Sequence, residues 1–175
     1  MSLEIQFKNN KFMALVFAGI IATVAHDVVM YSDTAYTGYQ TDVPLFLGYQ
    51  VLGESQYDRP VGYVLHYGTG IVMALLFGYV AFPISRRIVS WPIWILAVIF
   101  TTIELIVALW LVQFPLNGWG IAGLEYQAEI PLMTFTRHTV FGLTLGVLVS
   151  KWFKSDSGKS NEKIMKKIGG AEWKI

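Results

Sequence analysis

Four long apolar runs, separated by polar connections, constrain this chain more than any other feature. They cover residues 12–31, 61–83, 91–114 and 131–153. Each can cross a bilayer as a helix, which takes roughly 20 apolar residues. None alternates between apolar and polar positions, as a membrane β-strand does. The sequence therefore predicts an all-α fold, a four-helix transmembrane bundle over residues 1–153, followed by a polar, basic tail over residues 154–175.

Composition and charge place this bundle in a membrane and orient it there. Only 14% of the 175 residues are charged, against about 25% in soluble domains. Basic residues gather at one end of the bundle: Lys8, Lys11, Arg86, Arg87 and the lysines from Lys151 onward. Connections rich in Lys and Arg stay in the cytoplasm. We therefore expect a multi-pass protein of the cell membrane with both termini cytoplasmic and two acidic loops outside.

Six Asp, Glu, Arg and His residues fall well within the predicted spans, where charge is costly and usually functional. They are His26, Asp27, His66, Glu104, Arg137 and His138. At about 1.5 Å of rise per residue, the three histidines lie roughly 7–11 Å below the outer surface, and Glu104 lies near the midplane. Helices that run in opposite directions thus carry their histidines at one level.

Each histidine and Glu104 lies on a helix face that small residues at every fourth position extend. Such stripes mark the faces on which membrane helices approach closely. The stripes are His66–Gly70–Ala74–Gly78, His138–Gly142–Gly146–Ser150, Ala18–Ala22–His26 and Glu104–Ala108. The pattern predicts that all three histidines and Glu104 face other helices rather than lipid.

The chemistry that this cluster favours is metal binding. Imidazole is the commonest protein ligand of transition metals, and a carboxylate completes sets for zinc, copper or non-haem iron. We predict His26, His66, Glu104 and His138 as the metal ligands. Asp27 would orient the ligands or add to them, and Arg137 would neutralise Glu104 or Asp27.

Two other interpretations of the histidines stay open at this point. A haem held by two facing histidines needs room for the macrocycle, which Gly68, Gly70 and Gly142 could provide. A small metal ion uses more of the cluster, so we rank haem below it. Alternatively, each histidine only satisfies a hydrogen bond between helices.

Two segments resemble an uncharacterised family of four-helix membrane proteins found largely in archaea and bacteria. They are GYVLHYGTGIVMALLFGY (Gly62–Tyr79) and RHTVFGLTLGVL (Arg137–Leu148), and DVPLFLGY resembles that family's first outer loop. The resemblance covers about a fifth of the chain and implies a characteristic histidine in the second and fourth spans, here His66 and His138. It implies no activity.

Three functions fit these features, and the sequence leaves open whether the chain is an enzyme. The first is an accessory subunit of a larger membrane complex, such as an oxidoreductase or a copper monooxygenase. The second is a self-contained membrane metalloprotein or haem-binding protein. The third, a small proton-coupled transporter, lacks the repeated or broken spans typical of transporters. As partners we expect the lipid bilayer and larger membrane subunits, and no nucleic acid.

Overall fold

The computed structural model of the chain describes residues 10–39 and 41–169, with side chains described as far as Trp152. Within these ranges every regular element is a helix, joined by turns and irregular connections, and there is no strand. Four helical segments are long and apolar enough to cross a membrane: Lys11–Thr37, Asp58–Ile88, Ile93–Leu116 and Ile130–Trp152. Each of the four predicted spans falls on one of them. The chain therefore has the architecture of a multi-pass membrane protein.

The first and last spans are each a single helix. Helix α2 (Lys11–Thr37) runs six residues beyond the predicted span and ends at Gly38, which adopts a left-handed conformation (φ 76°). Polar residues prolong it because Ser32, Thr34 and Thr37 each donate a hydrogen bond to a carbonyl one turn back. Helix α8 (Ile130–Gly169) continues past the predicted membrane boundary. The predicted tail is thus helical as far as Gly169, and its remainder lies outside the described residues.

The two middle spans each contain a widened π-helical stretch. The second span consists of α4 (Asp58–Leu76), η1 (Phe77–Ala81) and α5 (Phe82–Ile88). The third consists of α6 (Ile93–Glu104), η2 (Leu105–Gln113) and α7 (Phe114–Leu116). Both stretches precede a proline, Pro83 or Pro115. Proline lacks an N–H group and its ring crowds the carbonyl four residues earlier, so a wider turn relieves the clash.

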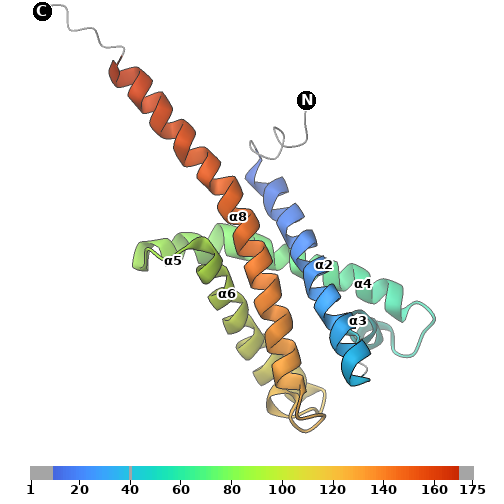
Figure 1. The fold of residues 1–175 in the computed structure, drawn as a ribbon. Helices are drawn as coiled ribbons and strands as arrows, with labels where there is room; N and C mark the ends of the chain where they lie inside the picture. Colours follow the sequence, from blue (N-terminus) through green and yellow to red (C-terminus); the bar gives the residue numbers. More distant parts are fainter. Residues whose placement is uncertain (1–9, 40, 170–175) are drawn as a thin grey trace, which may run out of the picture.

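Helix α8 occupies the middle of the bundle (Figure 1), packed against α2 on one side and α6 on the other. Helix α2 also packs on α4, and a short apolar helix in the first connection, α3 (Val43–Leu52), packs on α4. A short 3-10 turn, η3 (Ile121–Gly123), lies in the last connection.

The predicted small-residue stripes form the closest helix contacts. A methyl group on Gly70 of α4 would overlap the Thr23 hydroxyl of α2, and one on Gly142 of α8 would overlap the Thr101 hydroxyl of α6. Ala18, Ala22 and Ala74 have no exposed surface. In a membrane, van der Waals contact between closely approaching helices is a main source of association. These stripes therefore hold α2 against α4 and α6 against α8.

The start of α2 and the far end of α8 lie at the same end of the bundle (Figure 1). We predict that this end is cytoplasmic, and the chain has no cysteine, so single cysteines can be placed freely. An impermeant maleimide should label S55C from outside and S157C from inside the cell. A74C, at a fully buried position, is the control that should resist labelling from both sides. Labelling of S55C and S157C from one side would contradict the topology.

Candidate metal centre

The three predicted histidines come together between three different spans. The His26 ring, on α2, lies 5.1 Å from the His66 ring, on α4, and 5.8 Å from the His138 ring, on α8 (centroid distances). The three histidines therefore lie at the same depth, as residue counting predicted, and their side chains are also close together. His26 forms the middle of the cluster because its helix lies between the other two.

Asp27 connects two of these histidines through one carboxylate oxygen. Its Oδ1 lies 2.8 Å from Nε2 of His66 and 3.5 Å from Nδ1 of His26. The side chains of all three are largely buried, with exposed fractions of 8% for His26, 10% for Asp27 and 11% for His66. Adjacent residues on a helix usually point about 100° apart, yet here both side chains lie close to His66 of α4.

Glu104 and His138 form a second pair next to this group. Nε2 of His138 lies 3.4 Å from Oε2 of Glu104. The ring is fixed from behind because its Nδ1–H donates to the Thr134 carbonyl at 2.8 Å. The His138 carbonyl in turn accepts from Thr101 of α6 at 3.1 Å. His138 therefore faces Glu104 with one ring nitrogen, Nε2, and the contact between α6 and α8 holds the two residues together.

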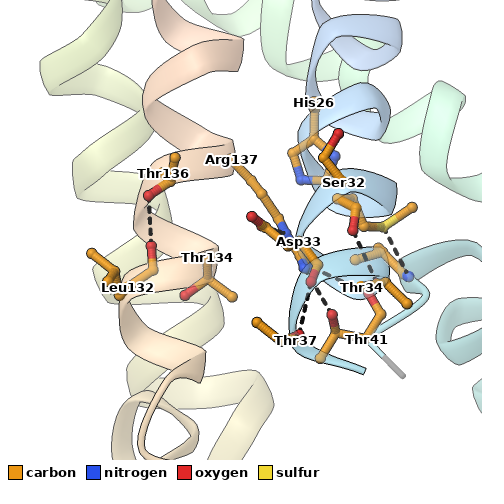
Figure 2. Close-up of polar contacts among 12 residues, drawn as sticks. His26, Ser32, Asp33, Thr34, Thr37, Thr41, Leu132, Thr134, Thr136 and Arg137 are labelled. Carbon is orange, nitrogen blue, oxygen red and sulfur yellow. Dashed lines mark hydrogen bonds and ion pairs between the residues drawn. The ribbon is translucent and has the colours of Figure 1, made fainter. Parts of the chain in front are cut away.

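Arg137 has a different carboxylate partner from the one we predicted. Its Nε donates to Oδ2 of Asp33 at 2.9 Å, and its terminal nitrogens donate to the carbonyl and hydroxyl of Thr41 at 3.2 and 2.7 Å (Figure 2). The prediction that Arg137 pairs with Glu104 or Asp27 was wrong. Helix α2 continues beyond the predicted first span and carries Asp33, which is the partner instead. Arg137 thus ties α8 to the end of α2 and to the connection that precedes α3.

Asp27 is close enough to both histidines to share an ion with them. The ligand atoms of His26, Asp27 and His66 all lie within 4.8 Å of one another, and among the described residues these three form the candidate group for one ion. Ligands about 2.0–2.2 Å from a tetrahedral metal are separated by about 3.4 Å. Small side-chain shifts would therefore suffice. Glu104 and His138 are a neighbouring pair rather than members of this group.

The structure removes part of the room that a haem would need. Gly70 and Gly142 were predicted to leave space, but both face closely packed threonine side chains on the adjacent helix. Of the three glycines considered for haem, only Gly68 has open space beside it. Gly70 and Gly142 therefore do not provide the room that the sequence suggested for a haem, and the three clustered nitrogen and oxygen ligands suit a bare ion.

A cavity of about 590 Å³ adjoins the cluster. Its polar wall contains His26, His66, Glu104 and His138, which the sequence singled out. Its other walls come from α3, η2, α7 and the last connection, and these the sequence reading missed. They include Leu45, Phe46, Leu109, Phe114 and Trp119. The apolar character of the α3 segment was visible in the sequence, but nothing there placed it against the histidines.

Comparison with known proteins finds no matching family model, no matching curated protein and no matching solved structure. The resemblance to a four-helix family noted in the sequence accordingly stays a prediction. Any functional conclusion has to come from the site itself.

Proposed function

We propose that the chain is an integral membrane metalloprotein that binds one transition-metal ion through His26, Asp27 and His66. The observation that carries this proposal is the buried carboxylate oxygen of Asp27, which lies against a ring nitrogen of each histidine. Ionisable side chains inside a membrane cost free energy, and for this reason they usually mark a functional site. Ligand groups that hydrogen-bond to one another are well placed to turn toward a shared ion.

The donor set is one that iron(II) and zinc both use in proteins. Two histidines and one carboxylate, with no sulfur ligand, form the set that non-haem iron(II) centres use, and such centres leave other coordination positions open. Zinc also accepts this set and keeps a fourth position for water in catalytic sites. Copper is the third candidate. Glu104 and His138 line the same cavity as the two histidines of the proposed ligand set.

Metal analysis of the full-length protein tests the proposal. Protein purified from membranes without chelator should contain about one ion per chain, or take up one on anaerobic titration with Fe²⁺, Zn²⁺ or Cu²⁺. His66→Ala should lose most of this uptake because it removes one of three ligands.

Thr69→Ala is the matched control, one turn further along α4. The Thr69 hydroxyl lines the cavity but donates to the Leu65 carbonyl within its own helix, so metal uptake should be unchanged. Correctly folded wild-type protein that takes up none of the three ions would end the metal proposal, and the histidines would then act as polar contacts between helices.

The accessory-subunit role stays a second proposal, with exposed aromatic side chains in its support. Tyr36, near the end of α2, Tyr49, on α3, and Tyr57, just before α4, are 93%, 56% and 61% exposed. Tyrosine is enriched where proteins associate. Gentle detergent extraction should then yield a complex well above the 19.7 kDa chain and its micelle. A monodisperse monomer in several mild detergents would contradict it.

A further inference from the structure

The cavity beside the metal ligands has two chemically different parts. One part presents Glu104, His66 and His138, and the other presents aromatic and aliphatic side chains from α3, α7 and the last connection. In the apolar part, the Trp119 ring lies 5.0 Å from Phe46 and 5.3 Å from Phe114. Pockets that bind small molecules combine a mostly apolar lining with a few convergent polar groups, and span about 300–1,000 Å³. The cavity of about 590 Å³ fits that description.

The polar part contains groups that are accessible although they lie deep in their spans. The side chains of Glu104 and His138 are 26% and 19% exposed, and both line the cavity. Oε2 of Glu104 is a hydrogen-bond acceptor that a hydroxyl group can reach from inside the cavity. The pair is therefore positioned to receive one O–H donor.

The carboxylate of Glu104 disfavours an anionic head group beside it. Arg137 also lines the cavity, but Asp33 and Thr41 already accept its hydrogen bonds. Its charge is thus balanced within the protein. A carboxylate or phosphate head beside Glu104 would meet a like charge, which costs free energy at short range in a medium of low dielectric constant. A neutral head group avoids this cost.

We propose that the cavity binds one neutral amphiphile taken from the bilayer, with a hydroxyl or phenol head at Glu104 and His138 and an apolar body against Phe46 and Trp119. The inference rests on the proposed function only in placing the head beside the metal ligands. An apolar body gains free energy there by dispersion contacts with the aromatic side chains. The hydroxyl supplies the hydrogen bond that sets its orientation.

Photolabelling tests this proposal on the full-length protein in phosphatidylcholine nanodiscs. The probe is a 4-alkylphenol with a diazirine on its chain, and the control probe is the same alkylbenzene without the hydroxyl. The phenol should label cavity residues on α3 and α8, such as Leu45 and Phe141. A roughly tenfold excess of plain 4-hexylphenol should reduce this labelling by about tenfold, by mass action at a single site. The alkylbenzene should label mainly lipid-facing residues.

Two variants and one control separate the cavity from the membrane surface. Leu45→Trp fills the apolar part and should abolish competed labelling. Leu65→Trp adds the same bulk on α4 at a position that is 37% exposed and should not. Glu104→Gln should reduce the preference for phenol over alkylbenzene. Labelling confined to lipid-facing positions, or insensitive to competitor, would overturn the proposal.

Metal uptake measured on the same samples keeps the two proposals distinguishable. Leu45→Trp that binds metal but not the phenol supports both proposals and shows that the variant is folded. Wild-type protein that binds metal while the phenol labels only lipid-facing residues overturns the cavity proposal alone. Wild-type protein that shows competed cavity labelling but takes up no metal overturns the metal proposal alone.

Discussion

Replacing Asp27 by asparagine should lower metal affinity by about a hundredfold or more. Even residues that only support a ligand cost 10–100-fold when they are changed, and Asp27 contacts both histidines directly. Asparagine keeps the shape but loses the negative charge that a divalent cation needs. Competition titration against a chelator of known affinity measures the change. Adding His66→Ala to this variant should cost little more, because ligands that share one ion are not additive.

Two other carboxylates of the chain provide the comparison for this experiment. Asp33→Asn changes the same residue type on the same helix, but its partner is Arg137, so metal affinity should stay close to that of the wild type. Glu104→Gln tests where the ion sits. A larger loss of affinity in Glu104→Gln than in Asp27→Asn would move the ion to the Glu104–His138 pair and contradict the assigned ligand set.

Replacing Arg137 by methionine should destabilise the folded chain by about 3 kcal/mol. Breaking a buried ion pair by removing one partner costs about 3–5 kcal/mol, since the other charge is left unpaired. The lower figure applies here because the Asp33 side chain is 24% exposed, although that of Arg137 is only 2% exposed. The variant also loses both bonds to Thr41. Unfolding in mixed micelles with increasing SDS measures the difference.

A double-mutant cycle shows whether the loss belongs to the pair. Arg137→Met combined with Asp33→Asn should be clearly less destabilising than the sum of the two single variants. Arg87→Met is the control, because Arg87 is exposed at the end of α5, and surface substitutions usually stay within about 0.5 kcal/mol. Additive effects of Arg137→Met and Asp33→Asn would show that the two side chains are not energetically coupled.

Most of the bundle could be predicted because straight helices obey one periodicity. The i+4 stripes beginning at His66 and His138, and the one ending at His26, lie at helix contacts as expected. The stripe from Glu104 was wrong, since Ala108 is exposed and Leu109 lines the cavity instead. The π-helical stretch η2 starts directly after Glu104. Its i→i+5 repeat moves the matching position on by one residue.

The parts of the site that escaped prediction depend on contacts distant in sequence. The partner of Arg137 lies 104 residues away on α2, and Thr41 lies 96 residues away. The sequence did not indicate that α2 would continue as a helix as far as Asp33. Likewise, a short apolar segment such as α3 could pack on lipid or on protein. Only tertiary packing decides which groups close the cavity.

Helix α8 is unbroken from the site to a point well beyond the apolar span (Figure 1). Between Trp152 and Gly169 it projects by about 25 Å at 1.5 Å per residue. Because α8 has no break between Ile130 and Gly169, a rotation of its projecting end would also turn the part of the helix that carries His138. A rotation of about 10° moves a side chain at the 5–6 Å helix radius by about 1 Å. A rotation of α8 by that amount would change the spacing between His138 and Glu104, because Glu104 lies on a separate helix, α6.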